Sequence, residues 1–378
     1  MSIVIVAFAV SLALTLCIVR FAKPHSRLTH DHDLSGPQKF HATPVPRVGG
    51  IGIVLGIAAG SLALRFRAPG EAWVAFTLLA CGAPAFGAGL VEDLTKRVSP
   101  RARLLFTAVS AGLASWALAA TIRHTAIPGL DWLVAVPLGA LAVTVFAVVG
   151  VANSVNIIDG FNGLASMCVV LMLAALAYVG FQVGDAVVGT LALAGIGAVL
   201  GFFVWNYPAG LIFLGDGGAY FLGFYVAELS ILLIGRNAHA VSPLFPLLVC
   251  VYPVFETLFS VYRRRVLRSL PPHMPDGIHL HSLIYRRVLR WAVGNRSARS
   301  LTRRNSMTAP YLWMLCMCSV LPAVLFYDDT PVLAAMLLLF GLTYTGLYWR
   351  IVRFRSPRWL RARWLSVPSR FEADNEGS

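Results

Sequence analysis

Four short polar motifs interrupt the long apolar segments of this chain, and they hold residue types that bind phosphates or metal ions. In chain order they are Glu92-Asp93-Leu94-Thr95-Lys96, Asn153-x-x-Asn156-x-x-Asp159-Gly160, Gly215-Asp216-Gly217-Gly218 and His279-Leu280-His281. Only 13% of the residues are charged, against about 25% in an ordinary soluble domain. Acids gathered between apolar segments therefore suit a metal-assisted reaction on a phosphorylated substrate at a bilayer surface.

The acids of two motifs are candidates for metal binding. Asp216 lies between glycines, so its carboxylate can reach a metal ion while the backbone approaches a phosphate closely. The alternative is a turn with an incidental acid. Glu92 and Asp93 are adjacent and could share a divalent cation. They could instead form a solvated helix end that pairs with nearby bases.

The second motif has side chains suited to reading a nucleotide. Asn153, Asn156 and Asp159 recur every three residues, which brings them close to one face of a short helix. Two amides and a carboxylate on one face could bind a nucleobase or a ribose by hydrogen bonds. The alternative is a polar helix cap, because Asn and Asp are good capping residues.

The fourth motif combines imidazoles with guanidinium groups. His279 and His281 are followed by Arg286, and together these side chains suit the oxygens of a diphosphate. The His-x-His pattern could also bind zinc, but no cysteine or third histidine stands close by in the sequence.

Composition and periodicity predict an all-α, polytopic integral membrane protein. Hydrophobic residues make up 58% of the chain, and apolar runs of roughly 20 residues recur throughout. The six cysteines all fall in these runs and are expected to be buried small hydrophobes. We expect eleven spans, at 2–20, 47–65, 71–91, 103–122, 131–151, 163–181, 187–205, 219–235, 243–262, 308–326 and 331–350.

The distribution of basic residues predicts the orientation of these spans. Of the 31 lysines and arginines, all but about four fall in the loops of one side, which the positive-inside rule makes cytoplasmic. The N-terminus is then periplasmic and the C-terminus cytoplasmic, and all four motifs face the cytoplasm. Residues 1–350 would form the membrane domain and 351–378 a basic tail. The net charge of +14 indicates contact with anionic lipid rather than nucleic acid.

Taken in order, these motifs and the segment His41-Ala42-Thr43-Pro44-Val45-Pro46-Arg47-Val48-Gly49-Gly50 resemble the polyprenyl-phosphate N-acetylhexosamine-1-phosphate transferase family. The match runs from about Pro37 to Arg287 and is closer to the WecA-like branch than to the MraY-like branch. This chain departs from the family at Glu92, where the family has Asp, and at Asn162, where many members have Asp. The last motif also lacks a further histidine.

The resemblance implies a reaction and its participants. A UDP-N-acetylhexosamine would donate its sugar-1-phosphate to undecaprenyl phosphate at the cytoplasmic face of the bacterial inner membrane, releasing UMP. This would be the first membrane step towards a surface polysaccharide such as O-antigen or capsule. Mg²⁺ would be the cofactor, with Mn²⁺ as the alternative metal. A homodimer stays open, and nucleic acid is not expected as a partner.

The resemblance also implies roles for individual residues. Glu92, Asp93 and Asp216 would be catalytic, with Asp216 and Asp93 as metal ligands. The substrate-binding set would be His41, Arg47, Lys96, Asn153, Asn156, Asp159, His279, His281 and Arg286.

The main rival hypothesis is a transporter or lipid flippase, and a second is a membrane phosphatase or diphosphatase that acts on the same lipids. An acid within a membrane span indicates function, protonation or pairing, and two acids, Glu228 and Glu256, fall inside apolar segments. Glu228 is the residue that best supports transport. Transport sites usually lie near the bilayer midplane, whereas the polar motifs here lie at the edge of the predicted spans, which favours chemistry at that edge.

Overall fold

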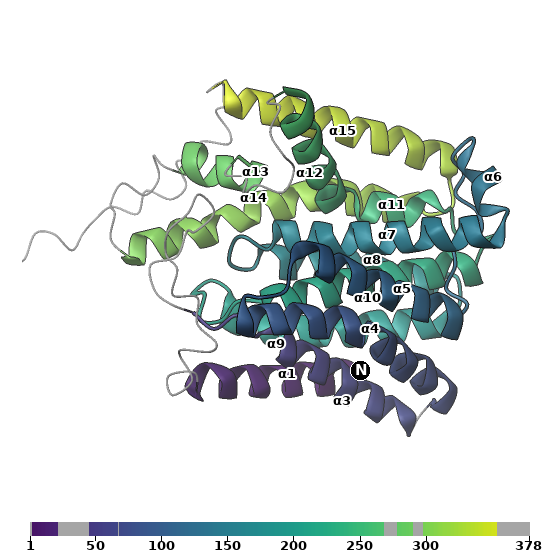
Figure 1. Cartoon of the computed structure of the whole chain (residues 1–378), viewed down its shortest axis with the longest axis horizontal. Coiled ribbons are helices and arrows are strands. Elements are labelled where there is room, and N and C mark those ends of the chain that lie inside the picture. The colour runs from purple at the N-terminus through teal and green to yellow at the C-terminus, as the bar shows by residue number, and fades with distance from the viewer. Residues whose placement is uncertain (1, 22–44, 67, 268–277, 290–297, 354–378) are drawn as a thin grey trace, which may run out of the picture.

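The computed structural model describes residues 2–21, 45–66, 68–267, 278–289 and 298–353. Its long helices lie side by side in one bundle, with α1 along the lower edge of Figure 1 and α15 along the upper edge. His41 and the tail beyond residue 353 lie outside the described residues.

Eight helices in the described ranges are long and apolar enough to cross a membrane, which confirms a polytopic, all-α membrane protein. They are α1 (Ser2–Phe21), α4 (Pro69–Thr95), α7 (Pro137–Ile158), α8 (Leu164–Gln182), α9 (Ala186–Asn206), α10 (Gly215–Arg236), α14 (Ala298–Leu325) and α15 (Thr330–Val352).

Shorter helices complete the bundle and its ends. They are α3 (Gly50–Arg65), α5 (Pro100–Ala117), α6 (Leu130–Val134), α11 (Leu244–Val249), α12 (Val251–Tyr262) and α13 (Leu280–Leu283), with π-helical turns at Arg263–Leu267 and Ile284–Val288. Each of the eleven expected segments overlaps a helix. The number of spans and their orientation stay predictions.

Prolines explain two differences between the expected segments and the helices. The expected span 243–262 is two helices that meet at Cys250, because Pro253 lacks an N–H and its ring would clash with the carbonyl of Val249 in a continuous helix. The expected span 131–151 is displaced to α7, because Pro137 takes the first helical position, where proline is favoured.

Helix α10 forms the centre of the bundle. In its most apolar stretch 94% of the residues are buried, against 17% in α1 and 22% in α15. Glycines let the neighbouring helices approach its first turn. A Cβ on Gly89 of α4 would lie 2.5 Å from the Cα of Gly217, and a Cβ on Gly50 of α3 would lie 2.5 Å from the Cα of Gly218. The first turn of the central helix, with the motif around Asp216, is therefore closely packed against α3 and α4.

Candidate active site

Asp216 lies in the first turn of α10, not in a loop. The turn into this helix requires glycine at the preceding position, because Gly215 has a φ of +78°. A Cβ on Gly215 would also lie 2.0 Å from the carbonyl oxygen of Arg47 and 2.6 Å from Oδ2 of Asp93. The glycine thus lets three motif segments meet at one point.

Asp93 caps the N-terminus of α10 from a different helix. Its Oδ1 accepts a hydrogen bond from the backbone N–H of Asp216 at 3.0 Å, and its Oδ2 accepts one from the N–H of Gly217 at 2.9 Å. The first N–H groups of a helix have no partner within the helix, and Leu214, at the N-cap position, makes no side-chain cap. The buried Asp93 supplies the missing acceptors.

Cations and an amide surround the carboxylate of Asp216. Arg103 forms an ion pair with Oδ2, and Nη2 of Arg47 lies 3.7 Å from Oδ1. Asn156 donates a hydrogen bond from Nδ2 to Oδ1 at 3.0 Å. The guanidinium of Arg103 also lies 5.7 Å from the centroid of the Tyr220 ring. The charge of Asp216 is thus paired with two guanidinium groups, and Nε of one of them, Arg47, also lies 4.0 Å from Oδ1 of Asp93.

Arg103 is a member of this cluster that the motifs did not identify. It lies in the first turns of α5, outside the four motifs. Its position shortly after the Glu92-Asp93 motif was the available signal, but several bases share that loop. Tyr220, one turn beyond Asp216 on α10, was also missed; its hydroxyl donates a hydrogen bond to Oδ1 of Asn153 at 3.3 Å.

Backbone pairing places Arg47 beside Asp216. The N–H of Phe213 donates to the carbonyl of Pro46 at 2.8 Å, and the N–H of Gly49 donates to the carbonyl of Phe213 at 3.0 Å. These bonds align the segment before α3 with the segment before α10. The predicted substrate-binding residue Arg47 and the predicted metal ligand Asp216 are thereby brought to one place.

Glu92 points to the loop after α4 instead of towards Asp216. Its Oε2 accepts a hydrogen bond from the backbone N–H of Val98 at 2.7 Å, so it stabilises the turn that leads to α5. Lys96 ends α4 in a left-handed conformation, with a φ of +57°. It is exposed and close enough to Asp93 to interact with it electrostatically.

Residues at the end of α7 contact both Asp216 and the histidine motif. Asp159 follows the last residue of α7, one turn beyond Asn156. Burial raises the pKa of Asp159 to about 7, and the positive charge of Arg47 opposes this effect. A Cβ on the next residue, Gly160, would lie 3.4 Å from Nε2 of His281. The second and fourth motifs therefore meet.

The two histidines of the fourth motif lie against each other. The rings of His279 and His281 are stacked, with centroids 5.1 Å apart and an interplanar angle of 15°. His281 also packs edge-on against Phe161 at 5.3 Å. Both histidines are buried, whereas Arg286 is exposed on the π-helical turn that follows. The structure thus brings the histidines, but not the Arg286 side chain, into the packed part of the site.

Asn162 has a structural role that requires a hydrogen-bond donor. Its Nδ2 donates to the carbonyl of Pro208 at 3.2 Å and to Oγ of Ser306 at 3.3 Å. Its own N–H donates to Oδ1 of Asn305 at 2.9 Å. An ionised carboxylate could accept but not donate these side-chain bonds, so the amide at this position suits the neighbours that it has.

The described residues fit a Mg²⁺ ion that takes most of its ligands from substrate and water. No group of three or more His, Cys, Asp or Glu side chains in the described ranges could enclose a metal. Mg²⁺ commonly binds one or two carboxylates together with substrate phosphates, and Asp216 is one such carboxylate. The oxygens of both Asp93 and Asp216 have partners in the structure, but the side chain of Asp216 is 14% exposed against 1% for Asp93, which makes Asp216 the more accessible carboxylate for a metal ion.

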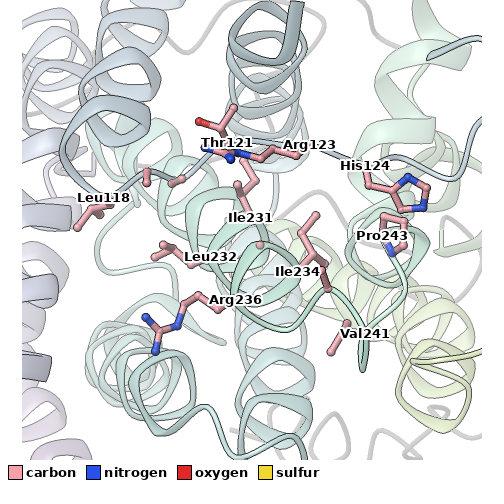
Figure 2. A pocket seen from close by; sticks show the side chains of 14 residues that line it. Leu118, Thr121, Arg123, His124, Ile231, Leu232, Ile234, Arg236, Val241 and Pro243 are labelled. Carbon is pink, nitrogen blue, oxygen red and sulfur yellow. The ribbon is translucent and has the colours of Figure 1, made fainter. Parts of the chain in front are cut away.

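Two cavities occur at the other end of the bundle. One, of about 370 Å³, is lined in part by Arg123, His124, Ile231 and Arg236 (Figure 2). A neighbouring cavity of about 540 Å³ shares Arg123. Neither is lined by a residue of the four motifs. The chemistry-bearing residues therefore define the candidate site, and these cavities do not.

The central part of the chain matches a known protein family. Residues 75–234 match the model of Glycosyl transferase family 4. The matched segment contains Asp93, Arg103, Asn156, Asp159 and Asp216.

Individual relatives show which members the chain is similar to. It is 29% identical to a probable undecaprenyl-phosphate N-acetylglucosaminyl 1-phosphate transferase of Bacillus subtilis, over 74% of this chain and 76% of the relative. It is 28% identical to the decaprenyl-phosphate N-acetylglucosaminephosphotransferase of Mycobacterium tuberculosis, over 79% and 76%. It is 29% identical to a phospho-N-acetylmuramoyl-pentapeptide-transferase of Geobacillus kaustophilus, over 77% and 94%.

Proposed function

We propose that this protein transfers N-acetylhexosamine-1-phosphate from a UDP-sugar to undecaprenyl phosphate at the cytoplasmic face of a bacterial inner membrane. The products are UMP and undecaprenyl-diphospho-sugar, the starting lipid for a surface polysaccharide. The family and the three relatives support the reaction class. The single observation that carries the proposal is the cluster in which Arg47, Arg103 and Asn156 surround Asp216.

The cluster suits a reaction between two anions. An oxygen of the lipid phosphate attacks the phosphorus that bears the sugar, and the bond from that phosphorus to the oxygen of the UMP phosphate breaks. Negative charge repels the two partners and accumulates on the leaving group, so positioned positive charge should supply most of the catalysis. Arg47 and Arg103 supply such charge from α3's leading segment and from α5.

A strong general base is not needed in this scheme. The second pKa of a phosphate monoester is about 6, so the attacking lipid phosphate is already mostly dianionic at neutral pH. We assign Asp93 the task of holding the first turn of α10, and Asp216 the task of holding the metal. Mg²⁺ bound there would neutralise phosphate charge and polarise the bond that breaks.

The remaining motifs surround this centre. Asn153, Asn156 and Asp159 at the end of α7 would bind the nucleotide, and His279 and His281 would contact the diphosphate or the sugar. The contact of His281 with the Gly160 and Phe161 segment supports a continuous donor site. Apolar helices on either side would hold the polyprenyl tail.

The test uses purified protein in detergent with undecaprenyl phosphate, a panel of UDP-N-acetyl sugars, and Mg²⁺ or Mn²⁺. Mass spectrometry should find UMP and a sugar-diphospho-lipid in equal amounts, both lost on addition of EDTA and restored by metal. Folded protein that releases no UMP from any donor would contradict the proposal. UMP release without a lipid product would instead indicate hydrolysis of the donor.

A further inference from the structure

Glu256 is a buried acid outside all four motifs, and its contacts converge on His279. It lies on α12, with 1% of its surface exposed, and His279 is 5% exposed. Nδ1 of His279 lies 2.9 Å from Oε1 of Glu256. The same oxygen accepts a hydrogen bond from the backbone N–H of Leu280 at 3.2 Å. The carboxylate thus holds both the side chain of His279 and the backbone that follows it.

Tyr344 holds the other oxygen of this carboxylate. Its hydroxyl, fully buried on α15, donates to Oε2 of Glu256 at 2.6 Å. The Tyr344 ring is fixed in turn by Phe255 and Phe259, with centroid distances of 5.0 and 5.6 Å. A carboxylate with three donors and aromatic packing has little freedom to turn, so its orientation is set before any substrate arrives.

The residue before His279 is fixed by a second pair of side chains. Nη1 of Arg263 donates to the carbonyl of Ile278 at 3.0 Å and to the hydroxyl of Tyr348 at 2.7 Å. Residues 278–280 are therefore held from both sides by α12, the turn that follows it, and α15. This support lies directly beside the stacked rings of the two motif histidines.

An ionised carboxylate can accept hydrogen bonds but not donate them. The contact with Glu256 therefore requires a proton on Nδ1 of His279, and Nε2 is the ring nitrogen that does not contact this carboxylate. A carboxylate that fixes the tautomer and orientation of a functional histidine is a recurring arrangement in proteins. Here the carboxylate, the tyrosine and the histidine come from three separate segments of the chain.

We propose that Glu256, supported by Tyr344, is a positioning residue that fixes the Nδ1-protonated form of His279 and directs Nε2 to the diphosphate of the sugar donor. The part that concerns the donor rests on the proposed function. The part that concerns the tautomer stands on the described contacts alone, and the two are tested separately.

The first measurement does not depend on activity. Long-range ¹H–¹⁵N spectra of detergent-solubilised protein with ¹⁵N-labelled histidine distinguish protonation at Nδ1 from protonation at Nε2, and the signals lost in His279→Gln identify the residue. We expect a proton on Nδ1 of His279 in the wild type and its redistribution to Nε2 in Glu256→Ala. A wild-type ring protonated only at Nε2, or a spectrum unchanged by Glu256→Ala, would overturn the proposal.

The second measurement asks whether Glu256 acts through His279. Loss of such an outer partner typically costs 10- to 100-fold, so Glu256→Gln should lower kcat by about that factor while KM for undecaprenyl phosphate stays within about threefold. In a His279→Gln background the same change should lower kcat by less than about threefold, because the two residues act as one unit. Effects that multiply independently would count against the proposal.

Tyrosine variants guard against a failure of the glutamate variants to fold. Tyr344→Phe removes one hydroxyl and keeps the ring packing, and we expect kcat to fall about 3- to 10-fold, again not additively with His279→Gln. Tyr252→Phe is the matched control. Tyr252 lies one turn before Glu256 on α12 and is fully buried, and its hydroxyl has no hydrogen-bond partner among the described residues. It should leave kcat unchanged.

The histidine spectra and the UMP assay distinguish a failure of the proposed function from a failure of the positioning role. If the wild type releases no UMP, the proposed function fails, and the spectra alone decide the role of Glu256. If UMP is released but the Nδ1 signal is absent or insensitive to Glu256, the transferase stands and the positioning role is wrong.

Discussion

The side chain of Asp93 and the backbone of Asp216 are joined by a hydrogen bond of 3.0 Å across 123 residues of sequence. Together with the bond to Gly217, it makes the end of α4 the cap of α10. The position of the Asp216 carboxylate thus depends on the second acid of a motif that was predicted to bind metal or to catalyse. The catalytic and metal roles of Asp93 stay predictions, and the capping role can be tested against them.

We expect Asp93→Asn to keep more activity than Asp93→Ala. An amide oxygen can still accept one of the two backbone bonds, whereas alanine leaves both buried N–H groups without an acceptor. Loss of a cap costs about 0.5–2 kcal/mol of stability, so Asp93→Ala should have the lower melting temperature in detergent. Equal and complete loss of UMP release in both variants, with unchanged melting temperatures, would favour the metal or catalytic role.

Asp216→Asn should abolish turnover while the protein still folds. The substitution keeps the shape of the side chain but removes the charge that pairs with Arg103 and would hold the metal. A fall in kcat of at least about 100-fold is expected from the loss of an electrostatic group at the reaction centre. Near-normal UMP release by Asp216→Asn would contradict the assignment of this residue.

Arg103→Lys should impair the reaction although it preserves the positive charge. Lysine is a point charge that cannot reproduce the planar contacts of the guanidinium with the Asp216 carboxylate and the Tyr220 ring. We expect kcat to fall by roughly tenfold or more, from a loss of about 1.4 kcal/mol in the transition state. Arg101→Lys, an exposed position on the same turn, is the control and should behave as the wild type.

Glu92→Asp should retain activity and lose some stability. The family has Asp at this position, but the longer side chain here reaches the N–H of Val98. Loss of that bond should cost about 0.5–1.5 kcal/mol, seen as a lower melting temperature, while kcat stays within a few-fold. Complete loss of UMP release would show that the longer arm is required for the reaction itself.

Asp159→Asn should stabilise the protein at alkaline pH and lose this advantage as the pH falls. Burial raises the pKa of Asp159 to about 7, whereas the unfolded value is about 3.9. The folded state therefore binds the proton more tightly, and the wild type gains stability as the pH falls from about 7 towards 4.

The check compares melting temperatures of wild type and Asp159→Asn in detergent without substrate. The variant should melt higher at pH 8, and the difference should narrow at pH 5. Asp328→Asn, at an exposed position, controls for the loss of one negative charge. A difference that does not depend on pH would contradict the shifted pKa.

The sequence could predict that the four motifs share one site. Few residue types bind phosphate and metal, and all four motifs fall at the ends of apolar segments that are predicted to face the cytoplasm. It could not predict Arg103, since nothing local distinguishes this arginine from its basic neighbours. Only the packing of α5 against α10 brings it to Asp216. The capping by Asp93 was hidden for the same reason, because the N–H groups that it satisfies belong to a helix 123 residues away.

Other features were within reach of the sequence. Pro253 is a signal for the break within the expected span 243–262, although α4 and α14 continue through internal prolines. Pro137 marks the start of α7. The buried Glu256 was noticed as an expensive acid, but its partner was not. Tyr344 is one of 11 tyrosines, and only the approach of α15 to α12 selects it.

The contact between Glu256 and Tyr344 also bears on how the protein is made. These residues are 88 positions apart, and Arg287 donates hydrogen bonds to the carbonyls of Ile351 and Val352 at the end of α15. During synthesis, the cluster around Asp216 can therefore assemble long before the last described helix leaves the ribosome, whereas the support of His279 cannot. A nascent chain inserted only as far as α14 would already contain Asp216, Glu256 and His279 but would lack the hydroxyl of Tyr344 that holds Glu256, so His279 gains its full support only once α15 has been inserted.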